Sequence, residues 1–131
     1  MTMEPAKVVL ELMSRRSSMH FAIGGGHDCC SLAREAVRLR TGRDPAPELT
    51  YSDQDSALAI LKQHGGLDGL LRHVLGEPVP PAELGMADIA LVRLPLVGEL
   101  VGVICRQGAI VPMPVGLDVA PARCVVHGWR I

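Results

Sequence analysis

The pattern of apolar residues changes once along this chain of 131 residues, at the proline-rich stretch 78–81. Before this stretch, apolar residues recur at the three- and four-residue spacing of amphipathic helices. After it, short runs rich in Val and Ile alternate with Gly and Pro, which is the pattern of strands separated by turns. Helices followed by a run of strands predict an α+β fold with an antiparallel sheet.

Four helices are expected in the first part, over residues 5–15, 29–41, 52–64 and 67–75. Pro5 suits a first helical turn, and Asp28 is the expected N-cap of the second helix. Ser52 and Asp55 resemble a capping box at the start of the third. Gly residues follow the last three helices and predict where they end.

Four strands are expected after the prolines, over residues 88–93, 100–106, 109–112 and 123–129. Gln107-Gly108 predicts a tight turn between the second and third strands. The chain has no repeat, low-complexity tract or linker, so one domain is expected over residues 1–131. In this interpretation residues 1–20 form an N-terminal helix and loop, and residues 21–131 form the main domain.

Composition excludes several classes of function. Aromatic residues make up 2% of the chain, too few for the stacking platforms that bind single-stranded nucleic acids. The formal net charge of -1 argues against a basic groove for phosphates, so no nucleic-acid partner is expected. Charged residues interrupt the N-terminus, and the apolar stretch 89–104 is broken and short, so neither a secretory signal nor a membrane anchor is expected.

The one site-like feature is the sequence Gly-Gly-Gly-His-Asp-Cys-Cys at residues 24–30. It places Cys29 in the first turn of an expected helix, where free N–H groups and the helix dipole favour a thiolate. The same groups could stabilise an oxyanion during acyl transfer, so Cys29 is a candidate nucleophile. The alternative is that Cys29 and Cys30 are small buried residues at a helix start.

A cysteine nucleophile also needs a base, and His27 and His127 are the candidates. His27 is next to the Asp28-Cys29 pair of the motif, and His127 lies on the last expected strand. No metal site is expected, because Cys29-Cys30 is not a Cys-x-x-Cys pair and no suitably spaced pair of histidines follows. No dinucleotide or P-loop fingerprint occurs, so no cofactor is expected. The four cysteines are expected to be mostly reduced thiols of a protein made in a cytoplasm.

Several features follow one another in a familiar order from Phe21 to the C-terminus. They are Phe-x₂-Gly-x₂-His-Asp-Cys-Cys, Thr41-Gly42-x-Asp44, Tyr51, Gly65-Gly66-Leu67, the strand residues 87–92 and 101–103, and Gly-Trp-Arg-Ile at 128–131. The ordered set resembles a small domain family encoded among tail genes of tailed phages and prophages. This resemblance implies a place in the virion tail, after synthesis in the host cytoplasm, beside other tail-tip proteins such as the hub, the distal tail protein and the central fibre.

The same chain resembles NlpC-type papain-like cysteine peptidases, whose Asp-Cys motif opens a helix. Asp28-Cys29 matches that motif, and Asp88 matches the Asp of the Gly-Asp strand. Residues 100–103, Leu-Val-Gly-Val, match the strand that carries the catalytic histidine, but Leu100 occupies the histidine position. The resemblance implies a papain-like, NlpC-like fold, with N-terminal helices packed on a C-terminal antiparallel sheet.

Three functions follow from these resemblances. The first is a structural component of a phage tail tip, or baseplate region, on a peptidase-like fold that has lost its base. The second is a cysteine peptidase or amidase that cuts cell-wall peptidoglycan, with His27 or His127 as a relocated base. The third is a tail-assembly factor absent from the finished particle. We expect the protein to work in an assembly and not as a free monomer, with residues 77–81 and the N-terminal helix as contact surfaces.

Overall fold

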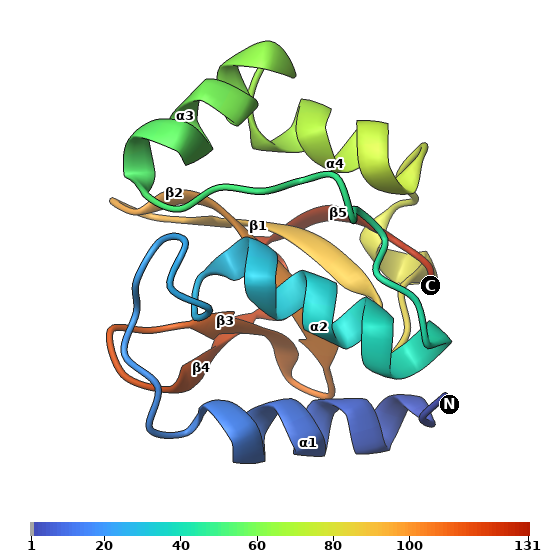
Figure 1. Ribbon diagram of the computed structural model, residues 1–131. Coiled ribbons are helices and arrows are strands. Elements are labelled where there is room, and N and C mark those ends of the chain that lie inside the picture. The colour runs from blue at the N-terminus through green and yellow to red at the C-terminus, as the bar shows by residue number, and fades with distance from the viewer. Residues whose placement is uncertain (1) are drawn as a thin grey trace.

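The structure, a computed structural model, describes residues 2–131 (Figure 1), so Met1 of the expected domain lies outside the described residues. The helices are α1 (Pro5–Arg16), α2 (Cys29–Thr41), α3 (Gln54–Gln63) and α4 (Leu67–Leu75), and 3-10 turns occur at Pro81–Glu83 and Ala122–Cys124. The strands are β1 (Ile89–Leu94), β2 (Gly98–Cys105), β3 (Gly108–Pro112), β4 (Leu117–Pro121) and β5 (Val125–Trp129). Within residues 2–131, no helix has the length and apolar character needed to cross a bilayer.

The five strands form one sheet in the order β4-β3-β2-β1-β5, and every neighbouring pair is antiparallel. The hairpins β1–β2, β2–β3 and β3–β4 join strands that are consecutive in the sequence. The last strand, β5, crosses to the other side and pairs with β1. The expected α+β fold, with N-terminal helices on a C-terminal antiparallel sheet, is confirmed.

Helix α2 lies against the sheet at β2 and β3, and α1 packs along α2 on its outer side (Figure 1). Helices α3 and α4 form a pair on the opposite side of α2 from α1. Most of the apolar side chains between these layers are fully buried, among them Val8, Leu12, Leu32, Ala36, Val101, Val103 and Ile110. This packing fixes the beginning of α2 beside the first half of β2.

The helix starts follow local capping chemistry. Pro5 occupies the first turn of α1, and Asp28 caps α2, both as predicted. The expected capping box of Ser52 and Asp55 is wrong by one residue, since Asp53 caps α3 and pairs with Ser56. A carboxylate on Asp53 can accept the N–H of Ser56 while the Ser56 hydroxyl accepts the N–H of Asp53, and this reciprocal pair satisfies two helix-end donors.

Strand β4 was not predicted, and the other four strands begin or end one or two residues away from their predicted bounds. The sequence of β4, Leu-Asp-Val-Ala-Pro, contains an acid and a proline. An edge strand tolerates both, and β4 is an edge strand that pairs only with β3. The turn between β2 and β3 consists of residues 106–107, not Gln107-Gly108, since Gly108 already pairs with Cys105. Residues 123–124 belong to a 3-10 turn, so β5 begins two residues later than predicted.

Candidate active site

Cys29 is the first residue of α2, and Asp28 fixes the start of that helix. Asp28 Oδ1 accepts a hydrogen bond from the Ser31 N–H at 2.8 Å, and Ser31 Oγ accepts one from the Asp28 N–H at 2.9 Å. Asp28 Oδ2 also accepts from the N–H of Gly24 at 3.0 Å. One buried carboxylate therefore holds both the helix start and the loop that precedes it, the glycine loop of residues 24–26.

The glycine loop is close to the segment that leads into α3. Gly24 has a left-handed backbone with φ 79°, and a Cβ there would come within 2.4 Å of the Ser52 carbonyl carbon. Only glycine fits this approach. Next to that contact, the Tyr51 hydroxyl donates to Asp28 Oδ1 at 2.7 Å. Burial, and then the Asp28 carboxylate, raise the pKa of Tyr51, so its hydroxyl remains a donor.

The two adjacent thiols differ in acidity. A hydrogen bond from the Cys30 thiol lowers the pKa of Cys29, and the backbone N–H of Val101 acts in the same direction, against burial and the charge of Asp28. The pKa of Cys30 is raised, first by its hydrogen bond to Cys29 and then by burial. If one thiol of this pair ionises, it is Cys29.

This difference predicts the order of chemical labelling. Iodoacetamide should modify Cys29 faster than Cys30, and at a pH below the free-thiol pKa of about 8.5. Peptide mapping by mass spectrometry over a pH series gives the midpoint for each thiol. In a Cys30→Ala variant the midpoint for Cys29 should rise, because the thiol donor is gone. Faster labelling of Cys30 in the wild-type protein would contradict this assignment.

The thiols lie in the wall of an apolar cavity of about 230 Å³ between α2, α3, α4 and the beginning of β2. Its apolar lining includes Phe21, Ile23, Leu49, Ala57, Ile60, Leu61, Leu67, Leu70 and Leu100. Asp28, Tyr51 and Glu99 supply the polar groups. Leu100, which takes the position of the peptidase histidine in the sequence resemblance, is therefore part of the same cavity as Cys29.

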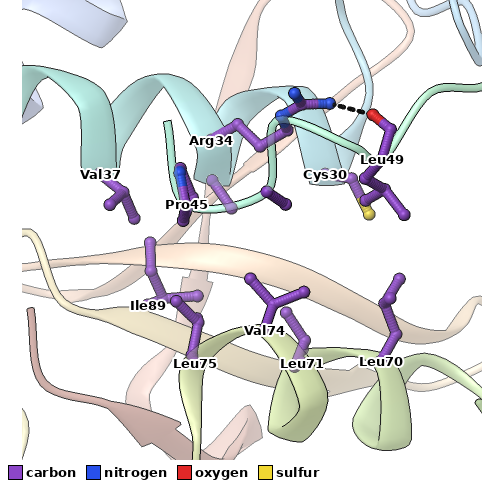
Figure 2. A pocket seen from close by; sticks show the side chains of 12 residues that line it. Cys30, Arg34, Val37, Pro45, Leu49, Leu70, Leu71, Val74, Leu75 and Ile89 are labelled. Carbon is purple, nitrogen blue, oxygen red and sulfur yellow. Dashed lines mark hydrogen bonds between the residues drawn. The ribbon is translucent and has the colours of Figure 1, made fainter. Parts of the chain in front are cut away.

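A smaller cavity of about 40 Å³ lies on the other side of Cys30, between α2 and α4 (Figure 2). Leu70, Leu71 and Val74 of α4 face Val37 and Cys30 of α2 across it. Arg34 Nη1 donates to the carbonyl of Leu49 at 2.7 Å. This bond holds the segment that joins α2 to α3 over the cavity. The same guanidinium pairs with Asp44 at 2.7 Å and lowers the pKa of that carboxyl to about 2.

His27 is fully buried, and both of its ring nitrogens have partners other than Cys29. Its Nδ1 lies 3.2 Å from Arg16 Nη1, and its Nε2 lies 2.9 Å from the carbonyl oxygen of Gly116. A guanidinium can only donate, so Nδ1 accepts and the Nε2–H donates to Gly116. In this arrangement His27 connects α1 to the β3–β4 turn.

Arg16 is the buried cation that holds this region. It donates to Glu35 Oε1 at 2.8 Å, to the Gly26 carbonyl at 3.1 Å and to the Ser31 carbonyl at 3.3 Å, in addition to His27. These contacts tie the end of α1 to the glycine loop and to the first turn of α2. No role for Arg16 follows from the sequence, because a single arginine at a helix end carries no motif.

His127 lies on β5 and is engaged by α4. Its Nε2 is 2.9 Å from Asp68 Oδ1, and its ring is edge-on to Trp129 with centroids 5.4 Å apart. Burial opposes ionisation of Asp68, but hydrogen bonds from His127 and Arg72 lower the pKa of that carboxyl. The three other histidines are His20, which is exposed, and His64 and His73, whose rings lie next to each other in the structure. Residues 2–131 include every histidine of the chain, and no histidine among them lines the cavity that contains Cys29.

The remaining expected site features are structural. Asp88 accepts hydrogen bonds from the N–H groups of Gly85 at 2.7 Å and Ile131 at 3.0 Å, so it holds the C-terminus against the start of β1. All four cysteines are free thiols. Tyr51 was noted in the sequence, but its bond to Asp28 was not foreseen.

Comparison with solved structures places this fold in a known class. The crystal structure of the NlpC/p60 domain of the peptidoglycan hydrolase SagA matches with a TM-score of 0.61, over 98% of this chain and 100% of that domain, at 15% sequence identity. The chain therefore has an NlpC/p60-like fold. Residues 5–131 match the family described as "Domain of unknown function (DUF6950)", and the protein belongs to that family. No curated protein matches the sequence significantly.

Proposed function

We propose that this protein is a structural component of a bacteriophage tail tip, built on an NlpC-like fold that has lost its catalytic base. The observation that carries the proposal is Leu100 in the cavity wall that also contains Cys29. In a cysteine peptidase the group at this place takes the thiol proton and returns it to the leaving amine. A leucine can do neither.

The surroundings of Cys29 also disfavour hydrolysis. General acid–base catalysis contributes roughly 10²- to 10⁴-fold to such a reaction, and no imidazole replaces the missing one at the thiol. His27 is held by Arg16 and Gly116, and His127 is held by Asp68, so the partner of neither imidazole is Cys29. An apolar cavity in addition raises the energy of the charged intermediate. What remains is a stable scaffold with a hydrophobic recess.

The tail-tip assignment rests on the ordered sequence features that resemble the phage tail-region family. We propose the hub, the distal tail protein and the central fibre as neighbours, and the virion tail as the location after synthesis in the host cytoplasm. The test is quantitative mass spectrometry of purified particles, which should detect this chain at a fixed ratio to known tail proteins. Its absence from particles, together with its presence in lysates during assembly, would replace this proposal with the assembly-factor alternative.

The peptidase alternative is supported by the NlpC/p60-like fold and by the position of Cys29 at a helix start, where its hydrogen bond with Cys30 lowers its pKa. Its test is digestion of purified peptidoglycan, followed by chromatography of the released muropeptides. We expect no release above that of a Cys29→Ala variant. Release by the wild-type protein that this variant abolishes would establish the hydrolase and overturn the structural proposal.

A further inference from the structure

The hairpin between β1 and β2 ends in an apolar loop that projects into solvent. The loop consists of residues 95–97, Pro-Leu-Val, and joins the paired residues Leu94 and Gly98. Leu96 is fully exposed, and Val97 is 64% exposed. Leu96 also has a left-handed backbone with φ 67°, a conformation that favours glycine or asparagine. A leucine is thus retained where both backbone preference and hydration disfavour it.

The apolar cavity opens at the same end of the molecule. In Figure 1 the β1–β2 hairpin, the glycine loop and the beginning of α3 lie together at this end. Phe21, on the cavity wall, is 43% exposed, and Leu58, beside the wall residue Ala57, is 53% exposed. Exposed apolar side chains therefore occur both on the hairpin loop and at the cavity wall.

The cavity has room for branched aliphatic side chains. An engineered cavity of about 150 Å³ lined by apolar residues binds benzene, and this one measures about 230 Å³. The 95–97 loop of the same chain does not fill the cavity, because Leu96 is fully exposed. After the loop, β2 continues through Glu99 and Leu100, which are part of the cavity wall. The cavity is therefore free to receive side chains from another molecule.

We propose that a second copy of this chain fills the cavity with its 95–97 loop, in a two-fold dimer in which each copy donates one loop and receives the other. Loop and cavity are neighbours on one surface, so a two-fold axis makes the same contact twice, as in most homodimers. Size supports this occupant, since one Leu and one Val match an apolar recess of this volume.

Charge at the edge of the contact supports the same occupant. The loop itself has no charged side chain, as entry into an apolar cavity requires. Arg93, at the base of the hairpin, has a 62% exposed side chain and pairs on its own chain with Glu99. Glu99 also lines the cavity, so an acid stands in its wall. A loop that enters the cavity of the other copy brings Arg93 to that copy's Glu99. The dimer is independent of the tail-tip proposal.

The thiols in the cavity wall allow a direct test. The donor variant combines Leu96→Cys with Cys29→Ala and Cys30→Ala, and is mixed with wild-type protein, which alone has the wall thiols. Oxidation by oxygen with copper phenanthroline should give a covalent dimer in which peptide mapping joins residue 96 to Cys29 or Cys30. The matched control carries Leu10→Cys instead, at a 66% exposed position on α1, and should not form this link.

A second measurement uses a change that the fold tolerates. Leu96→Gly removes the side chain and suits the left-handed backbone, so the folded monomer should be retained. By sedimentation equilibrium the wild-type protein should be a dimer at micromolar concentration, and Leu96→Gly should weaken dimerisation at least about 30-fold. Leu10→Ala should leave it unchanged. A monomeric wild-type protein, or cross-links from residue 96 only to another residue 96, would overturn the proposal in favour of a different occupant.

Discussion

Replacing Arg16 with methionine should lower the free energy of unfolding by about 2–4 kcal/mol, because a buried guanidinium that serves several acceptors is removed. The substitution leaves Glu35 without its buried cation, and it removes the donor to His27 Nδ1 and to the carbonyls of Gly26 and Ser31. Because these contacts join α1, the glycine loop and α2, we also expect increased proteolysis of the loop. Urea unfolding followed by circular dichroism measures the loss.

The neighbouring residue provides a matched control. Arg15 pairs with the same Glu35, at 3.1 Å, but its side chain is 46% exposed. Arg15→Met should therefore change the stability much less, since exposed ion pairs contribute little. Arg16→Lys should give an intermediate loss, because one ammonium cannot reproduce the planar fork of donors. Equal losses for Arg15→Met and Arg16→Met would show that burial of the guanidinium is not the cause.

Replacing Asp28 with alanine is the second change with a large expected effect, a loss of about 2–4 kcal/mol, since several hydrogen bonds to one buried carboxylate are removed together. The N–H groups of Ser31 and Gly24 and the hydroxyl of Tyr51 lose their acceptor. Tyr51 is the only tyrosine, so its ultraviolet titration reports this site alone. The pKa of Tyr51 should fall toward its ordinary value in the variant, while burial keeps part of the increase.

Helix α3 contains the same capping box in an exposed setting. Asp53 accepts from the Ser56 N–H at 2.8 Å, as Asp28 does from Ser31, but Asp53 has no tyrosine or glycine-loop partner. Asp53→Ala should cost much less than Asp28→Ala and leave the Tyr51 titration unchanged. If both alanine variants lose the same stability, Asp28 acts as an ordinary helix cap and does not organise the site.

The prediction of the fold depended on local chemistry that acts within a few residues. Pro5, the Asp28 cap and the glycines at helix ends each fix an element without help from distant residues. Strand β4 escaped prediction because its edge position needs no alternating pattern, and only pairing with β3 makes it a strand. The one-residue error at α3 has a similar cause, since Ser52 and Asp53 are both good caps, and the partner that completes the bond is Ser56.

The features of the site also divide into those that depend on neighbouring residues and those that depend on distant ones. From the sequence alone, Cys29 lies at a helix start behind an aspartate cap, because this statement concerns neighbouring residues. The resemblance to NlpC-type peptidases aligns Leu100 with their histidine. Only the tertiary structure showed that His27 belongs to Arg16 and Gly116, that His127 belongs to Asp68, and that the thiols border an apolar cavity. These contacts join residues up to 89 positions apart, and they arise from the packing of helices on the sheet, which no local pattern encodes.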